Sequence, residues 1–297
     1  MKLNDLRNIG IEKLKKENVE DAKFKIDILL QYILNMNKTD IIINSDIEIE
    51  NNIEKKFYNI IGELINGKPI QYITNSQEFM NLKFYVDENV LIPQPDTEII
   101  VEKSIEILEQ LLGLKKEVKI LDLCTGSGAI AVAIENYVLN RYNNSIEIYA
   151  SDISEKALEI AKINAKENNK NSKIIFIKSD MFNNINQNDF DIIISNPPYI
   201  ETDTIPTLSK EVQNEPHIAL DGGEDGLKFY KIISEKSPRY LRKNGYILLE
   251  IGYNQKKSVK KLLDNNNFYN IECIKDLAGN DRVLIAQNLI LFQPICT

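Results

Sequence analysis

The sequence predicts an α/β protein in which a small helical domain precedes a sheet covered by helices on both faces. The apolar spacing is helical in residues 1–67 and changes to aromatic and β-branched residues near turn formers in residues 68–95. From Asp96 onward, apolar β-rich runs alternate with helical stretches, which is typical of a parallel sheet. We therefore expect a helical domain at 1–67, a hairpin connector at 68–95 and a sheet domain at 96–297.

Each part rests on its own pattern. In the helical domain, Phe24–Ile33 and Ile53–Leu64 place apolar residues three and four apart. The predicted strands are VKILDL, IEIYAS, KIIFIKS, FDIIIS and GYILLEI, with weaker runs around Ile271–Ile274 and Val283–Ile285. The last segment, LILFQPICT, gives no recognisable pattern.

The composition excludes several classes of protein. With 43% hydrophobic and 27% charged residues, the chain is expected to fold as a soluble globule. A net charge of -8 provides no overall field toward nucleic acid phosphates, although a local basic patch could exist. Charged residues interrupt every apolar stretch near the N-terminus, so we expect no signal peptide, no membrane span and a cytoplasmic location.

Cysteine and histidine usage does not predict a metal site. Cys124, Cys273 and Cys296 are far apart, which favours reduced thiols over a disulfide framework or a zinc site. His217 is the only histidine, so sites with several histidine ligands are excluded and a Ser-His-Asp hydrolase has little support. We expect His217 to lie on the surface or in a loop.

Residues 119–130 predict a buried strand, a tight glycine loop and the start of a helix. Gly126 and Gly128 would let the backbone approach a ligand, and the N–H groups of the following helix could receive a carboxylate or phosphate. The loop lacks the lysine of a P-loop, and Ile130 and Ala131 break the dinucleotide G-x-G-x-x-G pattern. A nucleotide-binding turn is predicted, with a plain strand-to-helix turn as the alternative.

Acidic and apolar residues follow the next two strands. Asp152 comes after Gly128 at roughly the 20-residue spacing at which an acid meets ribose hydroxyls, although it could instead cap the following helix. After the third strand, Met181 or Phe182 could pack against an adenine that Asp180 reads. An apolar cluster beneath a loop would explain Met181 and Phe182 as well.

Strand FDIIIS leads directly into a tetrapeptide suited to a planar amino group. Asn196 offers a side-chain carbonyl, Pro197 a backbone carbonyl in a rigid segment, and Tyr199 an aromatic face. A conjugated -NH₂ is a poor nucleophile, but holding both its hydrogens would aim the nitrogen lone pair at a sulfonium methyl. The alternative is a tight proline turn after a strand.

These residues resemble class I S-adenosylmethionine-dependent methyltransferases with an N-P-P-Y motif, among them the release-factor glutamine methyltransferases of the HemK or PrmC family. Nearly the whole chain carries the resemblance, in DLCTGSGAIA, NPPYI, KPIQYITNSQEFMNLKFYVDENVLIPQPDTE, NEPHIALDGGEDGLKFY and LAGNDRV. It implies a Rossmann-like seven-stranded methyltransferase domain and an N-terminal helical domain that helps hold the release factor. The implied reaction transfers a methyl group to N5 of the glutamine in the Gly-Gly-Gln motif of release factors.

The resemblance also implies residue roles. The S-adenosylmethionine loop would comprise Cys124, Thr125, Gly126, Ser127 and Gly128. Asp152 would bind ribose and Met181 would lie beside the adenine. The glutamine amide would be held by Asn196, Pro197, Pro198 and Tyr199, of which Asn196, Pro197 and Tyr199 would be catalytic and Asn196 would also lie near the transferable methyl.

The chain departs from the family pattern at two positions. Cys124 stands where glycine is frequent, which should be tolerated if this residue needs no positive φ. Gln94 stands where arginine is common, which puts a salt bridge at the connector in doubt. Glu215, Asp221 and Glu224 lie in a segment that resembles the family, and we expect them to be solvated.

Three other functions compete with glutamine methylation. An N6-adenine or N4-cytosine methyltransferase would use the same motif, but it should add a basic groove or a recognition domain to this acidic chain. A non-enzymatic S-adenosylmethionine sensor should have a broken amide site, and a nicotinamide dehydrogenase should have the dinucleotide fingerprint. We therefore expect release factors as partners, without direct binding to nucleic acid or membrane.

Overall fold

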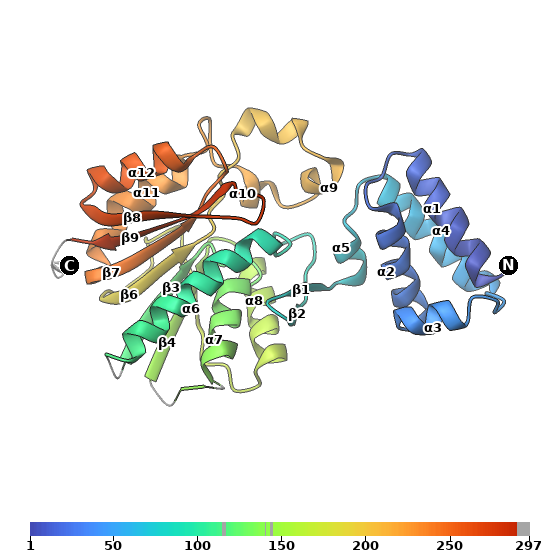
Figure 1. Ribbon diagram of the computed structural model, residues 1–297, viewed down its shortest axis with the longest axis horizontal. Helices are drawn as coiled ribbons and strands as arrows, with labels where there is room; N and C mark the ends of the chain where they lie inside the picture. Colours follow the sequence, from blue (N-terminus) through green and yellow to red (C-terminus); the bar gives the residue numbers. More distant parts are fainter. Residues whose placement is uncertain (115–116, 140, 143–144, 290–297) are drawn as a thin grey trace. The chain divides into compact units, whose positions relative to one another are not determined.

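The computed structural model describes residues 1–114, 117–139, 141–142 and 145–289, which form two compact units (Figure 1). The first unit consists of Met1–Ser76 together with Leu208–Glu215, and the second begins at Gln77 and contains the remainder. Within the described ranges, no helix combines the length and the apolar character needed to cross a membrane.

The first unit is helical and has its own apolar core. Its helices are α1 (Leu3–Lys16), α2 (Ala22–Leu34), α3 (Lys38–Ile43), α4 (Asn51–Ile65), α5 (Ile70–Thr74) and α9 (Lys210–Gln213). Helix α1 contacts α4 closely, because a Cβ on Gly10 would lie 2.5 Å from the Phe57 ring. The predicted α2 stripe is confirmed at Ile26, Leu29 and Leu30, whereas Phe24 is exposed.

Helix α9 belongs to the first unit although it follows the β6 strand of the second. The buried Lys25 amine forms an ion pair with Glu211, and the Asn214 side chain donates a hydrogen bond to the Gly67 carbonyl at 3.1 Å. A Cβ on Gly67 would lie 2.5 Å from the Lys210 Cβ. No pattern in the sequence predicted these contacts.

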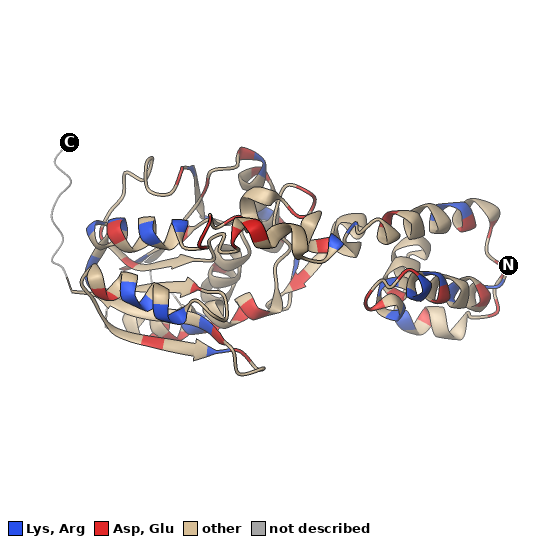
Figure 2. Ribbon diagram, turned by 90° about the horizontal axis from the view of Figure 1, so that it is seen from above, with Lys and Arg blue, Asp and Glu red and all other residues tan. Residues whose placement is uncertain are grey.

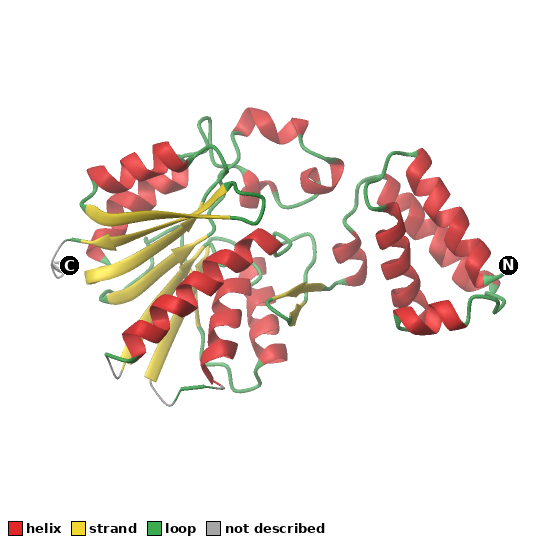
Figure 3. Ribbon diagram, viewed as in Figure 1, coloured by secondary structure: helices red, strands yellow, loops and turns green. Residues whose placement is uncertain are grey.

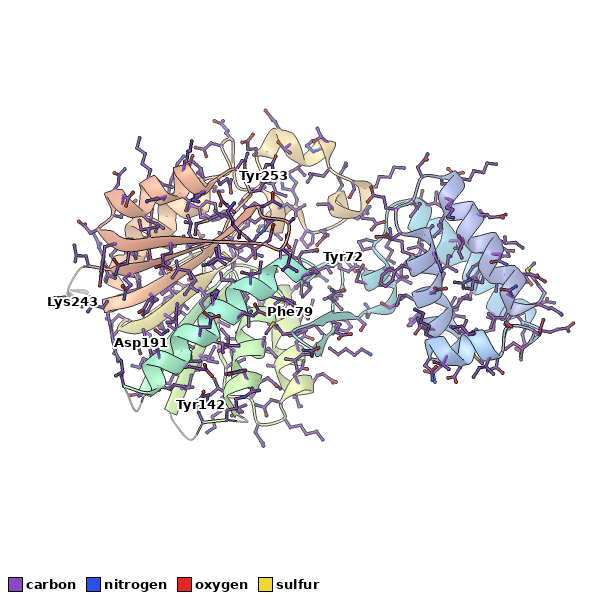
Figure 4. The ribbon with its side chains drawn as sticks, viewed as in Figure 1. Tyr72, Phe79, Tyr142, Asp191, Lys243 and Tyr253 are labelled. Carbon is purple, nitrogen blue, oxygen red and sulfur yellow. The ribbon has the colours of Figure 1, made fainter. Side chains whose placement is uncertain are left out.

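The segment after Gly67 contains a short helix as well as the predicted hairpin. Helix α5 occupies Ile70–Thr74, where the residue pattern favoured a hairpin over a helix, because five residues are too few for a helical period to be recognised. Strands β1 (Gln77–Phe79) and β2 (Leu82–Phe84) pair antiparallel as expected. Phe79, labelled in Figure 4, meets the Phe84 ring edge-on, and both belong to the core of the second unit.

The second unit contains a seven-stranded sheet, which confirms the predicted fold class. Its strands are β3 (Glu117–Leu123), β4 (Ser145–Asp152), β5 (Ile175–Lys178), β6 (Phe190–Ser195), β7 (Leu241–Glu250), β8 (Phe268–Lys275) and β9 (Asp281–Asn288). Their order is β5-β4-β3-β6-β7-β9-β8. The sheet is parallel from β5 to β7, as expected, whereas β9 runs antiparallel to both β7 and β8. The cause is a tight turn at Gly279, which joins β8 and β9 as a hairpin and therefore reverses the chain.

Helices cover both faces of this sheet (Figures 1 and 3). One face packs against α6 (Glu98–Leu112), α7 (Ala129–Leu139) and α8 (Glu155–Asn168), and the other against α11 (Lys228–Lys236) and α12 (Lys256–Asn265). The remaining short elements are η1 (Pro95–Thr97), η2 (Thr202–Thr207), α10 (His217–Leu220) and η3 (Ser237–Arg239). Because β3, β4, β6 and β7 are parallel, the loops after them gather at one edge of the sheet.

Candidate active site

A cavity of about 340 Å³ opens at the carboxyl ends of the parallel strands. Five residues predicted to bind the cofactor line it, namely Cys124, Gly126, Asp152, Met181 and Asn196. Other walls come from Asn89–Leu91, from α10 and its preceding Pro216, and from Lys228, Phe229 and Ile232 of α11. The loops after β3, β4, β5 and β6 thus meet in one hollow, as the order of the strands requires.

The glycine loop after β3 presents open backbone to this cavity. Gly126 has a φ of 54°, and a Cβ built there would meet no atom within 4 Å. Gly128 has a φ of 80°, and its Cβ would lie 3.0 Å from the Cβ of Ala161 in α8. Gly126 therefore leaves space beside the cavity, whereas Gly128 allows the loop to pack against a neighbouring helix.

Thr125, Ser127 and Gly128 shape the loop and do not line the cavity. The Thr125 hydroxyl donates to the buried Asp122 carboxylate at 2.6 Å, and the Ser127 carbonyl accepts from Asn164 at 2.9 Å. Burial raises the pKa of Asp122 to about 7, because the charged carboxylate is removed from water. These three predicted cofactor residues thus contact the rest of the fold and lie outside the cavity walls.

Cys124 does not meet the condition under which its departure from glycine should be tolerated. Its φ is 60°, in the left-handed region that favours glycine. Its Sγ lies 3.9 Å from the Sδ of Met181, which itself has a φ of 49°. Burial raises the pKa of the Cys124 thiol, so the sulfur is an uncharged part of the cavity wall.

Asp152 connects the glycine loop to the start of α8. One carboxylate oxygen accepts from the Gly126 N–H at 2.9 Å, and the other accepts from the Ser154 N–H at 2.9 Å. Ser154 itself is the N-cap residue of α8, so Asp152 supports the turn and does not cap the helix. Burial raises the pKa of Asp152, although the backbone N–H groups oppose this shift. Since a carboxylate has roughly four acceptor positions, Asp152 can still accept from a ligand hydroxyl.

The three residues after β5 have different environments. Met181 and the exposed Asp180 line the cavity. Phe182 does not line it; its ring is buried and stacks on Tyr240 with centroids 4.6 Å apart. Phe182 therefore fits the apolar-cluster interpretation and lies outside the lining of the cavity.

The tetrapeptide after β6 contributes Asn196 and Pro198 to the cavity wall, whereas Pro197 and Tyr199 do not line it. The Asn196 Nδ2 donates to the Thr97 Oγ1 at 3.2 Å. The backbone of Tyr199 is held by Gln255, whose Nε2 donates to the Tyr199 carbonyl at 2.9 Å.

Two glycines of the LDGGEDG segment lie directly against the backbone of the tetrapeptide. A Cβ on Gly222 would lie 2.7 Å from the Tyr199 Cα, and a Cβ on Gly226 would lie 2.5 Å from the Tyr199 carbonyl oxygen. A side chain at either position would displace the backbone of the motif.

A buried polar cluster beneath the tetrapeptide escaped the sequence analysis. Glu250 ends β7 and is 2% exposed, and among the described residues its Oε2 atom has no hydrogen-bond partner. Burial raises the Glu250 pKa to about 7, while the nearby Thr97 and Tyr199 hydroxyls and the Arg282 charge oppose the shift. The available signal was a carboxylate at the end of an otherwise apolar strand, GYILLEI.

Arg282 at the start of β9 supplies the positive charge of this cluster. Its guanidinium contacts Asp96 at 3.0 Å and Asp276 at 3.1 Å. A salt bridge therefore exists at the connector despite the departure at Gln94, whose side chain donates instead to the Ile92 carbonyl at 3.0 Å. Asp96 and Arg282 form this ion pair without an arginine at position 94.

The remaining candidates lie near α9 and α10. His217 is exposed, as expected. Glu215 is 8% exposed, so the expectation of a solvated side chain is wrong there. Asp221 is partly buried. Its carboxylate accepts hydrogen bonds from the Thr202 hydroxyl at 2.7 Å and from the Gly223 N–H at 3.0 Å. These bonds hold the pKa of Asp221 below its ordinary value.

Comparison with known proteins identifies the family of this chain. Residues 100–224 match the methyltransferase small domain, and residues 5–74 match the PrmC N-terminal domain. The release factor glutamine methyltransferase of Clostridium acetobutylicum is 40% identical over 96% of this chain and 98% of its own length. The chain belongs to the release factor glutamine methyltransferase family. A second member of this family, from Thermodesulfovibrio yellowstonii, is 44% identical over 77% of this chain and 79% of its own length.

A solved structure agrees with the family at the level of the fold. A methyltransferase from Pyrococcus furiosus superposes with a TM-score of 0.51 at 20% identity, over 78% of this chain and 99% of its own. This likeness supports the class of fold alone, while the family rests on the sequence matches over nearly the whole chain.

Proposed function

We propose that this chain uses S-adenosylmethionine to methylate the N5 side-chain amide of the glutamine in the Gly-Gly-Gln motif of peptide-chain release factors. The observation that carries the proposal is the meeting of Asn196, from the amide-binding motif, with Cys124, Gly126 and Asp152 around one cavity in a chain of this family. A small-molecule site and a motif for a planar amide are thus adjacent.

The cavity residues fit S-adenosylmethionine. A volume of about 340 Å³ lies within the usual range of roughly 300 to 1,000 Å³ for small-molecule sites. The open space at Gly126 would admit a ligand close to the backbone, and Asp152 retains acceptor capacity for ribose hydroxyls. Met181 would provide an apolar surface for the adenine. When bound, S-adenosylmethionine supplies a sulfonium methyl group that a nucleophile can take.

The residues of the tetrapeptide would orient the glutamine amide. The Asn196 Oδ1 and the Pro197 carbonyl would each accept one amide N–H, and Pro198 would form part of the wall beside them. The Tyr199 ring would offer a flat face, and its backbone is fixed by Gln255. Fixing both N–H groups leaves the nitrogen lone pair perpendicular to the amide plane as the direction of attack.

The alternative substrate, an exocyclic amino group of adenine or cytosine, has less support. Figure 2 shows acidic and basic residues intermixed on the helices of both units, and the chain carries a net charge of -8. Proteins that bind nucleic acid usually concentrate Lys and Arg on one face.

One experiment tests the proposal against that alternative. The purified chain is incubated with S-adenosylmethionine labelled on its methyl group, a purified release factor and duplex DNA in the same tube. We expect the label in the release factor and none in the DNA. Label confined to the DNA would reverse the choice of substrate, and label in neither would overturn the proposal.

A further inference from the structure

We propose that Tyr253 and Leu277 form a docking surface for the release factor, beside Asn196 and on the side of β6 away from the cofactor cavity. This inference rests on the proposed function and adds to it the residues that receive the protein around the methylated glutamine. Neither residue lines the cavity.

The order of the strands gives the amide motif two sides. In the order β5-β4-β3-β6-β7-β9-β8, the loops after β5, β4 and β3 line the cavity on one side of Asn196. On the other side, β7 runs parallel to β6 and its last residue, Glu250, lies opposite Val283 near the start of β9. Among the described residues, none of the cavity lining comes from the segment after β7 or from the turn between β8 and β9. A cofactor in the cavity therefore leaves the β7 side free for a protein substrate.

The segment after β7 is attached both to β9 and to the amide motif. Its first residue, Ile251, donates from its N–H to the Arg282 carbonyl at 2.9 Å. Near its end, the Gln255 Nε2 donates to the Tyr199 carbonyl at 2.9 Å. Tyr253, labelled in Figure 4, lies between these two anchored positions, so its backbone is held beside the tetrapeptide.

The turn that carries Leu277 is also held by hydrogen bonds. The Asp276 carboxylate accepts from the Asn280 N–H at 2.8 Å and from the Arg282 Nη2 at 3.1 Å. The Gly279 N–H donates to the Asp276 carbonyl at 3.0 Å, and its φ of 85° suits glycine. The turn thus presents Leu277 at a defined position, which lowers the entropy cost of binding a partner.

Both side chains are available to a partner. Tyr253 is 69% exposed, and Leu277 is fully exposed. One exposed apolar side chain is ordinary on a protein surface. Two of them on adjoining, hydrogen-bonded segments beside the amide motif are instead typical of a protein-binding surface, in which aromatic residues supply much of the affinity.

A loop that carries a Gly-Gly-Gln motif fits this surface. Its glutamine side chain must reach Asn196, so the residues on either side of the glutamine must lie on the surface around the motif. The two glycines have no side chains, which lets the loop backbone lie against the Tyr253 ring. Leu277 then contacts an apolar side chain next to the Gly-Gly-Gln motif.

The test separates docking from chemistry. Tyr253→Ala removes the ring, Tyr253→Phe keeps it, and Leu277→Ala shortens the second side chain. Leu114→Ala is the matched control, because Leu114 is 83% exposed and lies shortly before β3 begins, at the opposite edge of the sheet. Each full-length variant is assayed for KM and kcat on a release factor at saturating S-adenosylmethionine, for the Kd of S-adenosylmethionine and for the free energy of unfolding.

We expect Tyr253→Ala to raise KM for the release factor by about tenfold and Leu277→Ala by about fivefold, with kcat and the cofactor Kd within about twofold of wild type. Tyr253→Phe and Leu114→Ala should leave KM within about twofold of wild type. Unchanged KM in both Tyr253→Ala and Leu277→Ala, an equal rise in Leu114→Ala, or a loss confined to kcat would overturn the docking surface. A wild-type enzyme that leaves the release factor unmodified would overturn the proposed function itself, and this inference with it.

Discussion

Cys124 shows how one residue type can conflict with the backbone that its position requires. Its φ of 60° costs a non-glycine residue about 1 to 2 kcal/mol, and glycine avoids this cost. We expect Cys124→Gly to be more stable than Cys124→Ala by about 1 kcal/mol, because alanine loses the sulfur but keeps the strain. Urea unfolding of both variants measures the difference, and an alanine variant that is equally stable would contradict the strain argument.

The proposed amide chemistry depends most on Asn196. Asn196→Ala should lower kcat by about 100- to 1,000-fold, because it removes an acceptor that aligns the substrate amide. Cofactor affinity should remain within about threefold of wild type. Asn171→Ala, which changes an exposed asparagine outside the cavity, serves as the control for any general effect. Near-normal turnover by Asn196→Ala would refute its assigned role.

Asp152 and Asp180 are two carboxylates at the same cavity with different degrees of burial. Asp152→Ala should weaken S-adenosylmethionine binding by at least about tenfold, because it removes the proposed ribose acceptor and the anchor of the Gly126 N–H. Asp180→Ala, at an exposed position, should weaken S-adenosylmethionine binding less. Calorimetric titration of both variants decides the matter, and equal affinities for Asp152→Ala and wild type would rule out the ribose contact.

At the scale of elements, the buried end of β7 makes stability depend on pH. The folded Glu250 pKa of about 7 lies above its ordinary value of 4.5, so the folded state binds the proton more tightly than the unfolded state. This contribution is fully present below about pH 4.5 and is lost as the pH rises through 7. Relative to Glu250→Gln, the wild type should therefore lose stability between pH 5 and pH 8.

Denaturant unfolding of both proteins at several pH values in that range tests this dependence. Asp122 also has a pKa near 7, but it is present in both proteins and cancels from the difference. A constant difference in unfolding free energy across the range would mean that Glu250 does not titrate there.

Elements with strong local patterns were predictable, and those set by distant contacts were not. All seven strands of the large sheet appeared as apolar or β-rich runs, which are continuous in the fully buried β6 and weaker in the half-exposed β8. The direction of β9 was missed, since it depends on a tight turn at Gly279 that the apolar pattern does not encode. Helix α5 was missed because its five residues span little more than one helical turn.

Part of the cavity lining was predictable from the sequence. Asn196, Gly126 and Asp152 were identified because their chemistry is recognisable beside a strand end. Glu250 was missed as a buried polar residue, because its burial depends on how β7 packs in the folded sheet and not on a local pattern.

At the scale of the whole molecule, one compact unit combines two segments that are far apart in the sequence. Helix α9 lies about 130 residues beyond the rest of the first unit, yet Lys25 and Glu211 form an ion pair within it. A contact of this sequence separation leaves no local pattern, so it could not be predicted from periodicity.

The most direct test of the account is tandem mass spectrometry of a release factor after incubation with the full-length chain and S-adenosylmethionine. We expect a single added methyl group on the side-chain amide of the Gly-Gly-Gln glutamine, and none when Asn196→Ala replaces the wild type under the same conditions. Methylation of any other residue, or an unmodified glutamine after prolonged incubation with active wild-type protein, would contradict the central claim.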